Sequence, residues 1–292
     1  MNTSLTAVSH RLYTPITALN DHAERLQAQS LSDLIGGNTS LARHRASALA
    51  FTFGSLHLDL SKQRINQETL SLLVDWARSC GIEDKRRGLF AGAKVNTSER
   101  RVALHMAARW PAGTTPPEGM APAVAFCQQQ HLRMTDMVER LHQGEWFGAT
   151  GQAITDVVHI GVGGSDLGPK MISEALADRP SQARVSVHYV SSMDGAQLLP
   201  LMEQLDPATT LLVLASKSFT TADTQFNVRT ALAWLSDALE IDVPTVCRYQ
   251  LVGVSSKPEK MIEFGIPDAH QLAFKDWIGG RFSLWSPIGV SV

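Results

Sequence analysis

The sequence has little cysteine, no strong excess of either charge and no long apolar run, and each absence excludes a class of protein. Its three cysteines, Cys80, Cys127 and Cys247, lie far apart and form no C-x-x-C pair, so neither a disulfide framework nor a zinc site is expected. The net charge of −2 provides no broad basic surface for nucleic acid or an anionic membrane. No apolar run approaches the roughly 18 residues of a membrane span, and the first residues lack the apolar core of a secretory signal. We therefore expect a cytoplasmic protein that binds neither nucleic acid nor membrane.

What is present is the composition of a globular protein. Of the 292 residues, 44% are apolar and 18% are charged, and the length suffices for two domains or one large one. The 10 histidines are scattered without the i, i+4 spacing that would place two of them on one helix face as metal ligands. We expect no metal site.

The first part of the chain, residues 1–125, predicts a mainly helical segment. Asn66 can cap a helix with Leu70, Leu73 and Val74 on one face, and Gly81 would end it. Farther on, Asn96 with Glu99 resembles a capping box before "RRVALHMAARW", which predicts a second helix. The stretch "PAGTTPPEGMAP" that follows contains four prolines and two glycines, which exclude a long helix there.

The second part, residues 126–292, has a different rhythm. After a helical stretch, short apolar runs predict strands at 157–162, 185–190, 211–215, 249–254 and 272–274. Amphipathic stretches predict helices around 168–178, 196–205, 222–240 and 258–264. This alternation indicates a parallel sheet covered by helices on both faces. Ligands of such sheets bind beyond the carboxyl ends of the strands.

The first predicted strand runs into "HIGVGGSDLGPKM", where Gly161, Gly163 and Gly164 would let the backbone approach a ligand closely. The dinucleotide pattern G-x-G-x-x-G fails, because Asp166 stands at its last position. The nucleotide P-loop pattern fails as well, because Pro169 follows the last glycine where lysine is required. Tight packing alone explains such a turn equally well.

A second polar turn, "ASKSFTTADT" at residues 215–224, follows a strand that reads as buried. Seven of its ten residues are Ser, Thr, Lys or Asp. Ser or Thr here would cap a helix, or the hydroxyls and helix-start amides would bind an anion. Lys217 would add either its charge or only its backbone amide. Largely neutral donors suit a small phosphorylated metabolite better than a nucleotide with magnesium, for which no acidic ligand pattern is visible.

The third turn, "DWIGGRFSLWSPIGV", places Arg281 after Gly279 and Gly280. The planar fork of an arginine suits phosphate or a developing oxyanion. The alternative is a structural arginine that pairs with a helix end or with Asp276.

Taken in order, "GVGGSDLGP", "ASKSFTTADT" and "GGRFSLWSPIG" resemble the glucose-6-phosphate isomerase family. "LDLSKQRIN" and "GLFAGAKVNTSERRVALHMAAR" resemble family segments of similar placement, so the resemblance covers most of the chain from about residue 50 onward. It implies a sugar-isomerase (SIS) type three-layer αβα sandwich with a parallel sheet. It also implies a homodimer and reversible interconversion of glucose 6-phosphate and fructose 6-phosphate, in glycolysis and gluconeogenesis, without a cofactor.

The resemblance also implies roles for individual residues. Around the sugar phosphate it places four residues of the second turn and two of the first, namely Ser216, Lys217, Ser218, Thr221, Gly164 and Ser165. Gly280 and Arg281 would face the sugar, with Arg281 stabilising the enediolate. Two positions depart from the family pattern: Ser218 stands where the family usually has Thr, and Ser192 where it usually has Asn.

In the family, the general base is a glutamate and ring opening uses a histidine and a lysine, all in segments downstream of "GGRFSLWS". The resemblance therefore implies that this chain is an amino-terminal fragment without the second α/β domain, holding much of the phosphate site but little of the catalysis. The alternative is a non-catalytic, sugar-phosphate-binding regulatory module of the same fold. Arg281 favours the enzyme, because a phosphate sensor does not need it.

Overall fold

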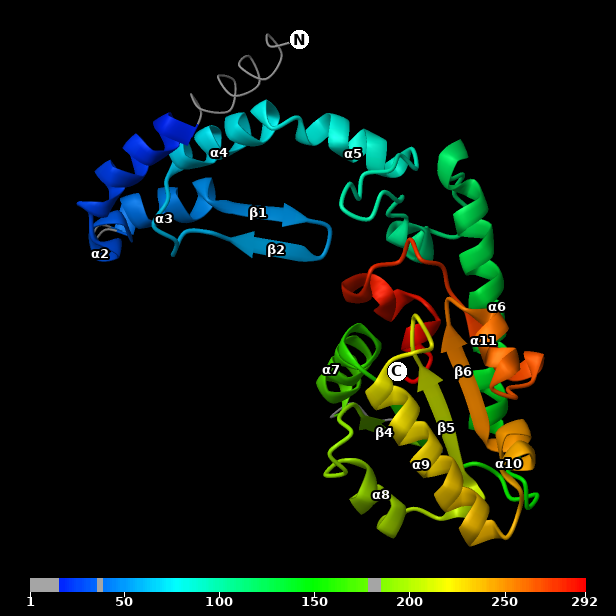
Figure 1. Ribbon diagram of the computed structural model, residues 1–292. Helices are drawn as coiled ribbons and strands as arrows, with labels where there is room; N and C mark the ends of the chain where they lie inside the picture. The colour runs from blue at the N-terminus through cyan, green and yellow to red at the C-terminus, as the bar shows by residue number, and fades with distance from the viewer. Residues whose placement is uncertain (1–15, 36–38, 178–184) are drawn as a thin grey trace. The chain divides into compact units, whose positions relative to one another are not determined.

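The computed structural model describes residues 16–35, 39–177 and 185–292. The chain divides into two compact units between Arg87 and Gly88 (Figure 1). The domain boundary predicted between residues 125 and 126 lies inside helix α6 (Ala121–Gln143). It stays a prediction.

Where the structure describes it, the first unit is helical apart from one hairpin. Its elements are a helix over residues 16–27, α2 (Leu31–Ile35), α3 (Thr39–Ala48), β1 (Ala50–Phe53), β2 (Leu56–Asp59), α4 (Gln67–Ser79) and α5 (Ile82–Phe90), the last of which runs past the division. The predicted cap of α4 is confirmed, since Asn66 Oδ1 accepts a hydrogen bond from the Thr69 amide at 3.0 Å. Gly81 follows α4 with φ of +67°. A left-handed residue at this place stops a helix.

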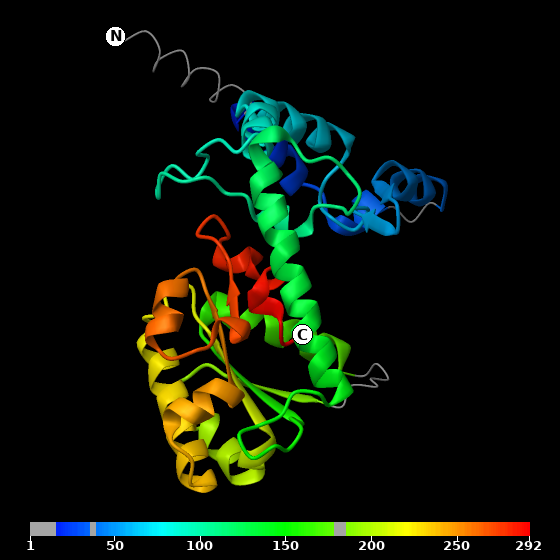
Figure 2. The same ribbon diagram turned by 90° about the vertical axis from the view of Figure 1, so that its right-hand side faces the viewer.

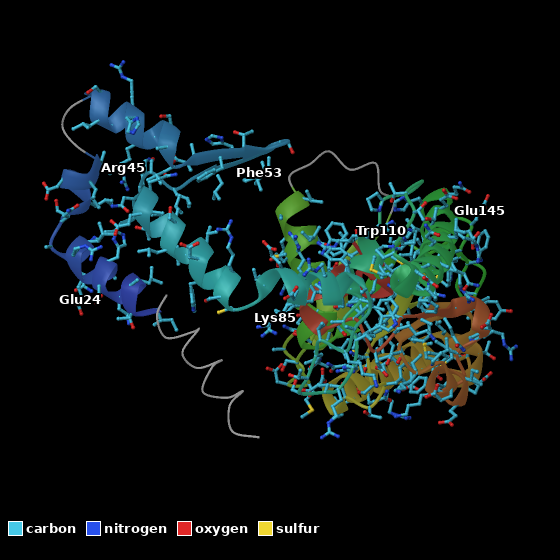
Figure 3. All side chains as sticks on the ribbon, turned by 90° about the horizontal axis from the view of Figure 1, so that it is seen from above. Glu24, Arg45, Phe53, Lys85, Trp110 and Glu145 are labelled. Atoms are coloured by element: carbon cyan, nitrogen blue, oxygen red, sulfur yellow. The ribbon has the colours of Figure 1, made fainter. Side chains whose placement is uncertain are left out.

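The hairpin β1–β2 was not predicted from the sequence. Phe51, Thr52 and Phe53 favour a strand, and Gly54 supplies the positive φ of +61° that its tight turn needs. Phe53 lies next to the turn and is 64% exposed (Figure 3).

The helix predicted after Asn96 is wrong. The Asn96–Glu99 contact forms, with the Glu99 amide donating to Asn96 Oδ1 at 3.2 Å, but it closes a turn rather than a helix. Asn96 pairs with Arg101 in an antiparallel bridge, and Arg100 between them has a positive φ of +53°. Only a short 3-10 helix, η1 (His105–Arg109), follows.

The second unit contains the sheet. Its helices are α6 (Ala121–Gln143), α7 (Leu167–Leu176), α8 (Leu198–Gln204), α9 (Ala222–Leu239), α10 (Val243–Gln250) and α11 (Pro258–Glu263). Its strands are β3 (Asp156–Gly161), β4 (Ser186–Val190), β5 (Thr210–Ala215), β6 (Leu251–Ser255) and β7 (Gln271–Ala273). The five predicted strands are thus confirmed within two residues at each end. Short 3-10 turns include η3 (Gly163–Ser165), η6 (Gly280–Trp285) and η7 (Pro287–Gly289).

The five strands form one parallel sheet in the order β4-β3-β5-β6-β7. Gly161 at the end of β3 pairs with Ala215 at the end of β5, and Ala215 pairs with Val254 of β6. The loops that follow these three strands therefore leave the sheet side by side. This register explains why polar turns far apart in the sequence meet at one edge.

Helices cover both faces of the sheet, which gives three layers. Alternate strand residues, such as Ile160 and Leu214, are buried against α8, α9, α10 and α11. Their neighbours, such as Val157 and Val213, are buried against α6 and η7, and α6 runs along that side as one long helix (Figure 2). The continuous burial of β5, with every residue from Thr210 to Ala215 inside, follows from having helices on both sides.

Candidate functional site

A cavity of about 330 Å³ lies at the carboxyl edge of the sheet. The turns after β3, β5, β6 and β7 line it, together with η6. The structure brings together all of the predicted site residues except Arg281: Gly164, Ser165, Ser216, Lys217, Ser218, Thr221 and Gly280. They come from three segments of the chain that the sheet register places next to one another.

The glycine-rich turn and the 279–281 turn touch through their backbones. A Cβ on Gly164 would lie 2.7–2.8 Å from the backbone of Gly280, so only glycine fits there. Ser283 Oγ joins the same two turns, with the Gly164 carbonyl at 2.9 Å and the Gly280 carbonyl at 2.7 Å. This contact explains the glycine at position 164, whereas a Cβ on Gly280 would meet only the Gly164 Cα, at 3.6 Å.

The 216–221 turn is held by its own hydroxyl groups. Ser216 Oγ accepts from the Phe219 amide at 3.1 Å, which supports the left-handed φ of +57° at Phe219. Ser218 Oγ accepts from the amide and the hydroxyl of Thr220, at 3.3 and 2.9 Å. The Ser218 proton therefore remains available to a ligand.

Helix α9 begins at this turn without a side-chain cap. Thr221 occupies the N-cap position, but its side chain accepts no capping hydrogen bond. Among the described residues, the amides of Ala222, Asp223 and Thr224 have no acceptor. A helix start with free amides carries partial positive charge and is a ready site for an anion.

Lys217 directs its charge toward the protein. Its ammonium donates to the carbonyls of Asp276 and Ile278, at 2.8 and 2.9 Å, and so ties the turn after β5 to the segment after β7. Burial lowers the pKa of Lys217, and the nearby Arg101 lowers it further. The sequence left open whether Lys217 offers a ligand its charge or only its backbone amide. In the structure, the ammonium instead joins two walls of the cavity.

Thr224 was not chosen from the sequence, although it ends the same polar stretch. Its side chain lines the cavity, is 1% exposed, and its Oγ1 has no hydrogen-bond partner among the described residues. Thr224 stands three residues after Thr221, so the two side chains share one face of the first helical turn. That spacing is the signal that could have identified it.

Arg281 is exposed and takes part in no hydrogen bond or ion pair within the part of the chain that the structure describes. The alternative pairing with Asp276 is not found. Asp276 instead accepts from Ser256 Oγ at 3.0 Å and lies 3.7 Å from Lys257 Nζ. Next to Arg281, Phe282 stacks on His105 with ring centroids 3.9 Å apart, which steadies the turn that carries the arginine.

The described residues contain no group of three His, Cys, Asp or Glu side chains arranged to hold a metal. Across the same residues, no helix is long and apolar enough to cross a membrane. Ser192, at the family's usual Asn position, lies outside the cavity, where its amide donates to Gln197 and its carbonyl accepts from Asn227.

Comparison with known proteins shows which family this chain resembles. The profile of the family described as phosphoglucose isomerase matches residues 59–292. The chain is 43% identical to glucose-6-phosphate isomerase 2 of Chromohalobacter salexigens over 286 residues, which cover 94% of this chain and 50% of the relative. It is 42% identical to the glucose-6-phosphate isomerase of Mycolicibacterium vanbaalenii, over 94% of this chain and 49% of the relative. The chain thus spans about half the length of the curated relatives it matches.

Among solved structures, a glucose-6-phosphate isomerase from Chlamydia trachomatis is similar with a TM-score of 0.73 at 21% identity, over 94% of this chain and 50% of that one. This likeness, with the parallel five-stranded sheet, confirms the predicted SIS-type α/β fold. The fold, the profile match over most of the length and the identity to curated relatives agree, and the chain belongs to the phosphoglucose isomerase family.

Proposed function

We propose that this chain carries the sugar-phosphate site of a glucose-6-phosphate isomerase. The reaction is the reversible conversion of glucose 6-phosphate to fructose 6-phosphate in glycolysis and gluconeogenesis, without a cofactor. The observation that carries the proposal is the convergence of the three family motifs on one cavity. Membership of a family whose curated relatives are named as isomerases of this substrate supports it.

The phosphate group binds at the start of α9. The free amides of residues 222–224 and the hydroxyls of Ser216, Ser218 and Thr221 supply neutral donors. Gly164 and Ser165 complete the cradle from the opposite turn, where Ser165 Oγ has no partner among the described residues. Lys217 acts by closing the cavity wall, because its ammonium is already bonded to two carbonyls.

The sugar extends toward Gly280 and Arg281. Moving a proton between C1 and C2 passes through an enediolate, whose negative charge is absent from the substrate. A guanidinium aimed at that oxygen stabilises the transition state more than the ground state, which raises the rate rather than the affinity. The absence of any described partner for Arg281 leaves its five donors available for this role.

Proton transfer at carbon also needs a positioned base. Among the described residues that line the cavity, the only carboxylate is that of Asp276, and Ser256 and Lys257 hold it. We therefore propose that this chain by itself binds sugar phosphate and turns over little or none of it. On family membership alone, we propose that the active form is a cytoplasmic homodimer.

The test uses a chimera in which this chain replaces the matching half of an active relative. We expect isomerase activity in a coupled assay, and a loss of about 100-fold in turnover for Arg281→Ala with a much smaller rise in KM. Arg281→Lys should restore only part of the rate, because a point charge does not reproduce the planar fork. A folded chimera that binds glucose 6-phosphate but has no activity would favour the alternative, a regulatory sugar-phosphate-binding module.

A further inference from the structure

His159 is an unexpected residue in the middle of a buried strand. It lies in β3 between Val158 and Ile160, and it is 0% exposed. A buried imidazole needs partners for both of its nitrogens. The proposed reaction does not use it, since it does not line the cavity.

Both ring nitrogens are occupied. Nε2 lies 2.7 Å from the Ser165 carbonyl oxygen, and Nδ1 lies 2.8 Å from Ser291 Oγ. Because a carbonyl only accepts, Nε2 carries the proton, and Nδ1 accepts from the Ser291 hydroxyl. Burial lowers the pKa of His159 to about 4, so the ring is neutral at physiological pH.

The Ser165 carbonyl belongs to the glycine-rich turn of the cavity. His159 and Gly161 are two residues apart in β3, so they lie on the same side of the strand. A Cβ on Gly161 would lie 2.6 Å from the Ser165 carbonyl oxygen. The turn therefore folds back over the end of the strand, and His159 donates to it at the point of closest approach.

This contact decides which groups of the turn face the cavity. The Ser165 carbonyl points back to His159, and the Gly164 carbonyl accepts from Ser283. With both carbonyls turned inward, the Gly164 amide and the Ser165 hydroxyl remain without partners among the described residues, on a turn that lines the cavity. Those are the donors that an anion requires.

Further hydrogen bonds hold Ser291, whose hydroxyl is the partner of the imidazole Nδ1. Tyr189 of β4 donates to the Ser291 carbonyl at 3.3 Å and shares a 2.7 Å hydrogen bond with Ser173 of α7. The rings of His159 and Tyr189 lie 5.3 Å apart. The Ser291 segment, tied to β4 and through Tyr189 to α7, thus holds the Nδ1 side of the imidazole.

We propose that His159 is a positioning residue for the phosphate site: its Nε2–H fixes the Ser165 carbonyl, and thereby directs the Gly164 amide and the Ser165 hydroxyl toward the ligand. The inference rests on the proposed sugar-phosphate site for its functional meaning. The hydrogen bond itself is testable without any ligand.

The experiment compares two variants of the 292-residue chain with a matched control. His159→Leu keeps a similar volume and removes the donor, while His159→Gln retains an amide N–H at about the place of Nε2. Titration with glucose 6-phosphate should show affinity about tenfold weaker in the leucine variant, the scale of one buried group left unpaired, with most of it restored in the glutamine variant. His188→Leu makes the same change in the neighbouring strand β4, where the imidazole lies 2.9 Å from Asp156 Oδ1 and away from the cavity, and we expect it to leave the affinity unchanged.

A second measurement needs neither a variant nor a ligand. Nitrogen-15 spectra of the imidazole should show the Nε2–H tautomer, and the amide signals of Gly163 to Asp166 should move in His159→Leu but return toward wild type in His159→Gln. An Nδ1–H tautomer, or turn amides that do not respond to either variant, would overturn the inference. Failure of the wild-type chain to bind glucose 6-phosphate would instead count against the proposed function and leave these two signals to decide on His159.

Discussion

At the scale of single residues, the site is marked by polar groups that the fold leaves without a protein partner. At the site these are the amides that begin α9 and the Thr224 hydroxyl; elsewhere among the described residues, Asp166 Oδ1 and Asn227 Oδ1 are also buried without a partner. A buried polar group without a partner costs about 1–3 kcal/mol, so a ligand that satisfies it regains that free energy. Such groups are expected where binding, rather than stability, has determined the sequence.

Thr224 gives the first prediction. Replacing it with valine keeps the shape and removes the unpartnered hydroxyl, so the free energy of unfolding should stay unchanged or rise slightly. Affinity for glucose 6-phosphate should fall by roughly 1–2 kcal/mol, the worth of a hydrogen bond to a charged acceptor. Calorimetric titration and denaturant unfolding on the same preparation measure both quantities.

Thr230→Val is the matched control on the same helix. The Thr230 hydroxyl donates to the Phe226 carbonyl at 3.0 Å and lies outside the cavity, so this change should not affect binding. Equal loss of affinity in both variants would mean that replacing threonine weakens binding by disturbing helix α9, and that the Thr224 hydroxyl does not contact the ligand.

His159 gives a pH prediction. Its folded pKa of about 4 lies below the ordinary value of 6.5, so only the unfolded chain takes up a proton between these values. Above pH 6.5 the residue contributes no pH dependence; as the pH falls from 6.5 toward 4, stability should drop by roughly 1.4 kcal/mol per unit, or roughly 3 kcal/mol in all. Half-buried His270, whose pKa is also lowered by burial, acts in the same direction.

Denaturant unfolding at pH 7 and pH 5 measures this slope. The expected result is that His159→Gln, which does not titrate, is less stable than wild type at pH 7 but shows a shallower fall in stability toward pH 5. Parallel curves for the two proteins would show that the imidazole is not kept neutral by the fold.

At the scale of elements, the site depends on two turns that meet backbone to backbone. Gly164→Ala should push the glycine-rich turn away from Gly280, because the added methyl would lie 2.7–2.8 Å from backbone atoms that cannot move aside cheaply. Overpacking of this kind costs about 1–3 kcal/mol in stability, and the displaced donors should weaken sugar-phosphate binding as well.

Gly279→Ala is the control, one residue before Gly280 in the same turn. Its new methyl would meet only the Phe282 ring at 3.7 Å, an ordinary contact, and its φ of −74° suits alanine. Thermal unfolding and titration should leave this variant close to wild type. If both variants had the same Tm and the same affinity, the close approach at Gly164 would contribute to neither stability nor binding.

The elements also show why part of this structure could be predicted from sequence. Strand β5 is an almost continuous apolar run, strand β3 is an apolar run interrupted by His159, and both end in polar turns, so their place and the edge where ligands bind follow from pattern alone. Helix α10 was missed because Gln250 passes directly into β6 at Leu251, with no glycine or proline to mark the change. The orientation of Lys217 could not be predicted either, since it depends on carbonyls 59 and 61 residues away in sequence.

At the scale of the whole molecule, every residue that lines the cavity belongs to the unit that begins at Gly88. A protein of residues 88–292 should therefore bind glucose 6-phosphate as tightly as the 292-residue chain, once circular dichroism shows that it is folded. Loss of binding by a folded protein of this length would mean that residues before Gly88 contribute to the site.

In the proposed site, the turns after β3 and β5 hold the phosphate of a sugar phosphate, with the sugar toward Arg281. A crystal structure of the 292-residue chain with glucose 6-phosphate tests it most directly. We expect phosphate oxygens within hydrogen-bonding distance of the amides of residues 222–224 and of the Ser218 and Thr221 hydroxyls, with the sugar ring beside Gly280. Phosphate bound elsewhere on the chain, or a sugar ring directed away from Gly280 and Arg281, would contradict it.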